Sequence, residues 1–201
     1  MRRYGDACIE DLWIGFFCVS SDLTRARVRV HRDGPIWKAV RASIALPGVF
    51  EPVVEGKHLL VDGAVLNNLP GDVMRQLGGG WVIAVDVSPE RDLEVRTDRL
   101  PAPWRVVLGW FLPFARAPEH PNIVDLMMRT TLLGSIQKTE TVKKTVDLYI
   151  QPPTRRFRMN QFKALEEIAE TGYRHAAESL KAWLETHPEV ARLLPDRESP
   201  R

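Results

Sequence analysis

The residue best placed for acid–base chemistry in this sequence is Asp62. It ends a short apolar run over 58–61 and is followed by Gly63 and Ala64. In open α/β sheets, catalytic groups and ligands gather at the carboxyl ends of strands. A carboxylate in such a place can act as a general base if partial burial raises its pKa above the usual value of about 3.9. The alternative is structural, because Asp-Gly is also a common turn dipeptide.

The sequence offers no equally clear nucleophile. A serine nucleophile on a strand-to-helix turn is typical of G-x-S-x-G, a motif that does not occur in the 201 residues. Ser135 and Lys138 have the spacing of the serine–lysine pair of β-lactamases, but the partner motifs are missing, and we interpret the match as chance. Residues 78–80 are glycines that follow a predicted helix and precede a predicted strand, which indicates a helix end rather than a phosphate loop.

Metal and cofactor chemistry has no support in the sequence. The five histidines are scattered without the spacing of metal ligands, so we expect neither a metal site nor a cofactor.

Two clusters suggest contact with lipid. The first is an aromatic patch with basic edges, made of Trp104, Trp110, Phe111 and Phe114 between Arg105 and Arg116. Such residues suit the boundary between water and lipid, although an element packed on the core explains them as well. The second is a basic cluster around Phe157, namely Arg155, Arg156 and Arg158, which is either a solvated loop or a contact for anionic headgroups.

Hydrophobic periodicity and turn residues predict alternating strands and helices. Strands are expected over 12–19, 26–31, 58–61, 81–87 and 146–150. Helices are expected over 36–45, 70–77, 122–144 and from a cap at Asn160 to about residue 184. This alternation predicts a single α/β domain with a mainly parallel sheet.

Charge and cysteine content restrict the kinds of partner and the cellular compartment that we expect for this chain. Lys and Arg total 28 against 26 for Asp and Glu, so the net charge of +2 gives no argument for nucleic acid as a partner. Two cysteines, Cys8 and Cys18, imply no disulfide framework and favour a reducing compartment. We therefore expect a cytoplasmic location, with peripheral contact at the inner membrane face. The most apolar stretch, 106–115, is shorter than the roughly 20 residues that a membrane-crossing helix needs.

Several segments, taken in order, resemble the C-terminal part of a patatin-like phospholipase domain in its neuropathy-target-esterase-like branch. They are IEDLWIGFFCVSSDLT at 9–24, VRVHRDGPIWKAVRASIALPGVFEPV at 28–53, HLLVDGAVLNNLPGDVM at 58–74, VIAVDVS at 82–88 and VDLYIQPP at 146–153. The resemblance covers about residues 4–184. We assign 1–184 to this domain and expect 185–201 to be a polar, disordered tail.

The resemblance implies a three-layer α/β/α fold and a serine–aspartate dyad that hydrolyses acyl esters of phospholipids or lysophospholipids. Asp62 matches the dyad aspartate, and Gly63 and Ala64 complete the D-G-[AG] motif of the family. The aspartate would accept the proton of the nucleophile and later help activate the deacylating water. Asn67 and Asn68 would lie in the loop that frames the active site.

The resemblance also implies that the glycine-rich oxyanion loop and the G-x-S-x-G nucleophile lie upstream of the matching segments. We therefore expect the first strand and the nucleophile helix to be missing and the chain alone to be inactive. One hypothesis is a fragment or a mis-started reading of such an enzyme. The others are a non-catalytic module that binds lipid or a membrane surface, and half of a split enzyme completed by a separate N-terminal half.

Overall fold

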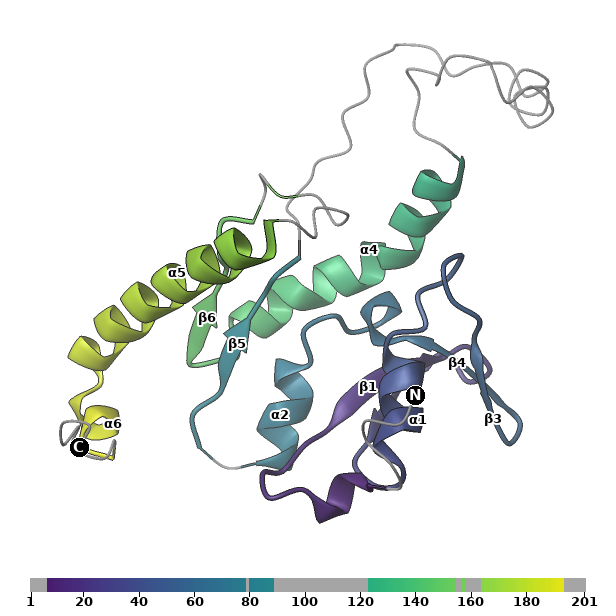
Figure 1. The fold of residues 1–201 in the computed structure, drawn as a ribbon, viewed down its shortest axis with the longest axis horizontal. Helices are drawn as coiled ribbons and strands as arrows, with labels where there is room; N and C mark the ends of the chain where they lie inside the picture. The colour runs from purple at the N-terminus through teal and green to yellow at the C-terminus, as the bar shows by residue number, and fades with distance from the viewer. Residues whose placement is uncertain (1–6, 79, 89–122, 155–156, 158–163, 194–201) are drawn as a thin grey trace, which may run out of the picture. The chain divides into compact units, whose positions relative to one another are not determined.

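The computed structural model describes residues 7–78, 80–88, 123–154, 157 and 164–193 (Figure 1). The chain divides into two units, one made of Met1–Asn68 with Asp92–Glu140 and the other of Leu69–Arg91 with Thr141–Arg201. The division falls within the long helix α4 (Ile123–Lys143). Helices and strands occur in both units, which confirms the α/β class.

The first unit is built on a four-stranded sheet with the order β2-β1-β4-β3. Its strands are β1 (Cys18–Asp22), β2 (Arg27–His31), β3 (Val53–Glu55) and β4 (His58–Asp62), and all neighbours pair antiparallel. Short turns join β1 to β2 and β3 to β4, and such turns allow only antiparallel pairing because parallel strands need a long crossover. The pairing of this sheet therefore differs from the mainly parallel sheet expected from the sequence, and β3 was not predicted.

Asp22 shapes the turn between β1 and β2. Its Oδ1 accepts hydrogen bonds from the backbone N–H groups of Thr24, at 3.0 Å, and Arg25, at 3.2 Å. Its Oδ2 lies 3.0 Å from Nδ1 of His58, close enough for an ion pair when the imidazole is protonated. The carboxylate of Asp22 is buried, so these partners offset the cost of removing it from water.

The strand predicted over residues 12–19 is wrong. The strand in this part of the chain is β1, and Leu12–Phe17 precede it without forming helix or strand. Trp13 is fully exposed, whereas the polar residues Ser20 and Ser21 of β1 are completely buried. An apolar sequence does not by itself ensure that a segment is buried. Burial here follows from position, because β1 is flanked by β2 and β4 on its two edges.

Helix α1 (Ile36–Ser43) confirms the helix predicted over 36–45 and packs on β1 and β4. Its apolar face is buried through Ile36 and Ala39, which pack with Ile9 of the short 3₁₀ helix η1 (Ile9–Asp11). Two backbone hydrogen bonds connect the start of the chain to α1: Ile9 N–H donates to Gly34 O, and Ile36 N–H donates to Ala7 O. The segment before β1 is therefore held at its beginning, near the N-terminus of α1.

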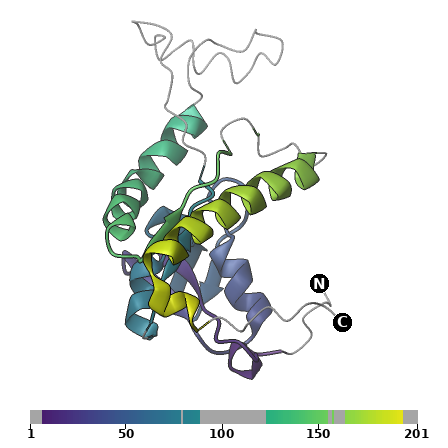
Figure 2. The same ribbon diagram turned by 90° about the vertical axis from the view of Figure 1, so that its left-hand side faces the viewer.

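The second unit contains the parallel pairing found among the described residues. It comprises α2 (Gly71–Leu77), β5 (Ile83–Val85), β6 (Leu148–Ile150), α5 (Leu165–Thr186) and α6 (Pro188–Ala191), and β5 pairs with β6. Helix α5 runs beside β6 in both views (Figures 1 and 2), and Trp183 packs on Leu148 and Ile150. The predicted cap Asn160 lies outside the described residues. Helix α5 begins at Leu165, and helical structure extends past residue 184.

Asp147 connects three parts of the second unit. Its Oδ2 accepts the N–H of Val82 at 2.7 Å, just before β5, and also accepts from Nη2 of Arg75 on α2 at 2.6 Å. Burial alone would raise the pKa of Asp147, but the hydrogen bonds from Val82 and Arg75 lower it overall. The ionised carboxylate therefore stabilises the folded state of this unit.

The chain leaves β4 through the 3₁₀ helix η2 (Gly63–Val65), which passes very close to β1. A Cβ placed on Gly63 would lie 2.5 Å from the carbonyl oxygen of Val19 and 2.8 Å from its Cγ2. Because the nearest atom belongs to the backbone of the central strand, it cannot rotate away. Residue 63 must therefore be glycine for β4 and η2 to keep this position against β1.

We predict that Gly63→Ala destabilises the folded chain by about 1–3 kcal/mol, the range for overpacking a closely packed site. Urea denaturation followed by circular dichroism measures the difference. Gly134→Ala in α4 is the matched control, because nothing lies within 4 Å of its Cβ position. There the alanine should be neutral or stabilise the helix by up to about 1 kcal/mol. Equal effects of the two substitutions would contradict the close approach.

We predict that Asp147→Asn lowers the free energy of unfolding at pH 7 by about 1–3 kcal/mol, since it removes the charged acceptor of two hydrogen bonds. The pKa of Asp147 is lowered in the folded state, so its contribution is present above the unfolded pKa and is lost as pH falls through the folded pKa. The gap between wild type and variant should therefore close below about pH 3.9. Glu185→Gln, at an exposed residue of α5, is the control and should show no such gap.

Candidate active site

Asp62 is held by its backbone on two elements. It is the last residue of β4 and pairs with Ser20 of the central strand β1. Its N–H donates to the carbonyl oxygen of Ala45 at 3.0 Å, and Ala45 is completely buried after the end of α1. Strand pairing and the connection that follows α1 therefore fix the same residue.

One oxygen of the Asp62 carboxylate is engaged and the other is not. Oδ1 accepts the N–H of Ala64 at 2.8 Å, so the side chain caps η2. Within the part of the chain that the structure describes, this is the one hydrogen bond of the carboxylate. Burial raises the pKa of Asp62, and the bond from Ala64 lowers it by less. The result is a half-buried carboxylate that is more basic than an ordinary aspartate and has an oxygen available to a proton donor.

The residues after Asp62 form one hydrogen-bonded segment. The N–H of Asn67, which is buried, donates to Gly63 O at 2.8 Å. The next residue, Asn68, is exposed, and its N–H donates to Oγ of Ser135 on α4 at 2.9 Å. Backbone hydrogen bonds thus hold Asn67 next to Gly63 beyond Asp62, and connect Asn68 to α4. The structure gives Ser135 the role of a buried hydrogen-bond acceptor.

Sequence reasoning missed a buried pair on β1 and β2. Oγ of Ser20 lies 2.8 Å from Nε2 of His31, and both residues are buried. Ser20 pairs directly with Asp62, so their side chains project from the same face of the sheet. Burial lowers the pKa of His31, which favours the neutral imidazole. The alternating 26–31 run gave no signal for this pair, because it places His31 in phase with the exposed Arg27 and Arg29.

The serines on the elements that hold Asp62 do not resemble nucleophiles. Ser20 and Ser21 are completely buried, and Oγ of Ser21 donates to Gly63 O at 3.5 Å. Ser43, at the end of α1, hydrogen-bonds the thiol of Cys18, whose pKa burial raises. Among the described residues on these elements, Asp62 therefore has no accessible serine hydroxyl beside its carboxylate.

Several predicted contacts lie outside the described residues. These are Trp104, Trp110, Phe111 and Phe114 of the aromatic patch, and Arg155, Arg156 and Arg158 of the basic cluster. In the described ranges, no helix has the length and apolar character needed to cross a membrane. The same ranges contain no cluster of three or more His, Cys, Asp or Glu residues that could hold a metal ion.

Known proteins are similar both to the segment that contains Asp62 and to most of the chain. Residues 2–74 match a family model described as patatin-like phospholipase. The chain is 38% identical over 181 residues to a patatin-like phospholipase domain-containing protein of Caenorhabditis elegans, covering 88% of this chain and 13% of the relative. It is 35% identical over 175 residues to the neuropathy target esterase sws of Drosophila melanogaster, covering 85% of this chain and 12% of the relative.

A third relative is a lysophospholipase of Meyerozyma guilliermondii, 33% identical over 185 residues, with 90% of this chain and 13% of the relative covered. The chain thus spans about an eighth of the length of these relatives. The match includes Asp62 and all four strands of the first unit. The resemblance inferred from the sequence motifs is confirmed: the chain belongs to the patatin-like phospholipase family.

Proposed function

We propose that this chain carries the general base of a patatin-like lipid acyl hydrolase, and that Asp62 is this base. The observation that carries the proposal is the half-buried carboxylate, with its raised pKa and one oxygen that no described residue engages. A perturbed pKa with a clear physical cause is typical of catalytic groups. Asp62 also lies within the segment that matches the family model.

The free oxygen of Asp62 would take the proton of a serine hydroxyl while the serine oxygen attacks the carbonyl carbon of an acyl ester. Collapse of the tetrahedral intermediate breaks the ester bond, and the leaving alcohol takes the proton from Asp62. In the second half, Asp62 accepts a proton from water as the water attacks the acyl-enzyme. Release of the fatty acid returns that proton to the serine oxygen, so the enzyme is regenerated unchanged.

The serine in this scheme comes from a polypeptide beyond residues 1–201. The sequence has no G-x-S-x-G motif, and Ser20 and Ser21, beside Asp62, are completely buried. Asp62 therefore needs a nucleophile and oxyanion donors from a further N-terminal segment, whether covalently continuous or separately encoded. Without them the carboxylate has no hydroxyl to activate.

The substrate class follows from the family. Relatives carry the names phospholipase and lysophospholipase, so we propose an acyl ester of a phospholipid or lysophospholipid as the substrate of the complete enzyme. Such substrates lie in a membrane or micelle, which makes peripheral contact with a lipid surface part of the proposal.

The 201-residue chain alone should neither hydrolyse short-chain p-nitrophenyl esters above background nor react stoichiometrically with a fluorophosphonate. The reason is that loss of one oxyanion donor already costs about 10²–10³ in kcat, and the nucleophile is absent as well. Ester hydrolysis and mass spectrometry of the labelled protein measure the two outcomes, with an active serine lipase as positive control. Labelling of one serine per chain would overturn the assignment of the nucleophile to another polypeptide.

Asp62→Asn should raise the thermal midpoint of the chain at pH 7, by up to about 2–4 °C if the gain approaches 1 kcal/mol. Asparagine keeps the bond from Ala64 but carries no charge to desolvate. Because the folded pKa of Asp62 is raised, its stabilising contribution is complete below the unfolded pKa and is lost as pH rises through the folded pKa. The gain should thus vanish below about pH 3.9. Asp33→Asn, at an exposed turn residue, is the control; a loss of stability in Asp62→Asn at pH 7 would refute the desolvated carboxylate.

A further inference from the structure

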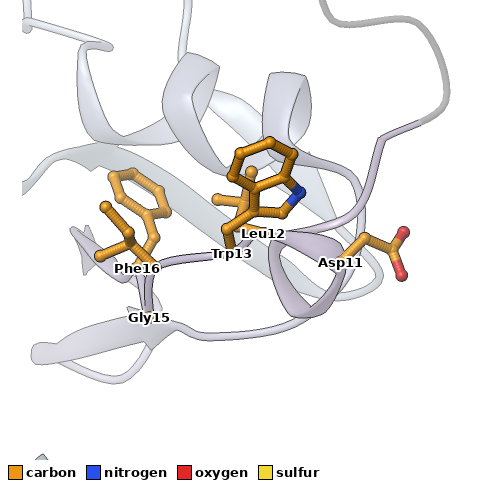
Figure 3. Close-up of a pocket in the computed structure, with 6 residues that line it drawn as sticks. Asp11, Leu12, Trp13, Gly15 and Phe16 are labelled. Atoms are coloured by element: carbon orange, nitrogen blue, oxygen red, sulfur yellow. The ribbon is translucent and has the colours of Figure 1, made fainter.

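The segment Leu12–Phe16, called here the 12–16 segment, exposes an apolar surface immediately before β1. Trp13 is fully exposed, at 103%, and Ile14 is 82% exposed. The residues of the segment, with Asp11, line an open pocket (Figure 3). Leu12, Trp13 and Phe16 point to the same side of the backbone, and the carboxylate of Asp11 points away from them. The segment itself contains no charged side chain.

Most of the backbone of the 12–16 segment also lacks hydrogen-bond partners among the described residues. The N–H of Leu12 donates to Ile9 O at 3.2 Å, which closes η1. From Trp13 to Phe16, no backbone N–H or C=O group makes a hydrogen bond with any described residue. The segment then continues directly into β1, whose own backbone is paired on both edges. It therefore combines exposed apolar side chains with backbone donors and acceptors that no described residue engages.

The exposed apolar side chains and the backbone groups without partners together indicate whether a lipid or a polypeptide binds the 12–16 segment. A hydrocarbon layer would cover the side chains but leave backbone groups without partners, at a cost of several kcal/mol each. An added extended polypeptide satisfies both, because it contributes backbone hydrogen bonds together with side-chain contacts. The acidic residues Glu10 and Asp11, directly before the segment, also oppose an anionic membrane surface. The observations thus favour a polypeptide.

The position of the segment indicates which polypeptide. It enters the sheet at Cys18, and Ser20, two residues later, pairs with Asp62. A chain bound along the 12–16 segment therefore comes to the end of the sheet where Asp62 has its free oxygen. We propose that the 12–16 segment is the docking edge for the polypeptide that supplies the serine nucleophile, which binds there as an added extended strand. This inference rests on the proposed function of Asp62.

The test uses the full 201-residue chain and a recombinant polypeptide from the Caenorhabditis elegans relative, taken from directly before its aligned region and chosen to include the G-x-S-x-G motif of the family. Titration should show saturable binding, and hydrogen exchange of the amides from Trp13 to Phe16 should slow when the probe is bound. The double variant Trp13→Ser with Ile14→Ser should weaken binding at least tenfold. Both side chains are exposed, so the variant should fold with an unchanged thermal midpoint.

The matched control is Tyr173→Ser with Leu193→Ser, two side chains of the second unit that are 71% and 76% exposed. It should leave the affinity for the probe within twofold of wild type. The proposal is overturned if the probe does not bind, or if it binds the Trp13/Ile14 variant as tightly as wild type. It is also overturned if phosphatidylcholine vesicles or a second copy of the chain, and not the probe, bind in a way that depends on Trp13 and Ile14.

Ester hydrolysis by the mixture separates this inference from the proposed function. Binding that depends on Trp13 and Ile14, but without hydrolysis sensitive to Asp62→Asn, supports the docking edge and refutes Asp62 as the base. Hydrolysis that is sensitive to Asp62→Asn but unaffected by the Trp13/Ile14 variant supports the base and refutes the docking edge.

Discussion

Between β4 and η2 the chain passes the carbonyl group of Val19 with no space for a side chain at residue 63. This approach holds the end of β4 against the central strand and determines where the carboxylate before it and the amide after it lie. Asp62 and Ala64 are thereby close enough for the 2.8 Å bond that engages Oδ1 and leaves the other oxygen open. A functional group at the rigid end of a strand is placed more accurately than one on a loop.

The basicity of Asp62 has a simple origin. Its pKa is raised by loss of water and not by a second carboxylate, and a backbone amide limits the rise. Charged residues on the same face of the sheet, such as Asp22, have partners of their own. Ser20, the strand partner of Asp62, carries a neutral hydroxyl, and burial lowers the pKa of its neighbour His31. Ser20 and His31 satisfy each other, so they fill the face beside Asp62 without adding a charge. A carboxylate in such surroundings responds mainly to how much water reaches it.

Local patterns predicted the elements around Asp62 well where one segment contained the whole signal. The run that ends in Asp62, Gly63 and Ala64 combines a strand and a turn, and α1 lies between a turn and a Pro-Gly stop. The strand over 12–19 was predicted wrongly because composition says nothing about which neighbours a segment will have. The central strand is instead a polar run, buried because β2 and β4 flank it. Likewise, the contact between Ser20 and His31 spans two strands, and no single-segment pattern contains it.

The exposed 12–16 segment has a consequence for the cell that makes this chain. Open apolar surface next to unpaired backbone is the type of surface on which proteins aggregate and on which quality-control systems act. With the docking that we propose, synthesis of this chain in excess over its partner polypeptide would leave molecules prone to aggregation or degradation. Little of the chain would remain uncovered if the chain and the proposed partner polypeptide were made in equal amounts, or if they were parts of one polypeptide. The edge thus links protein abundance to assembly, independently of any effect on the rate of a reaction.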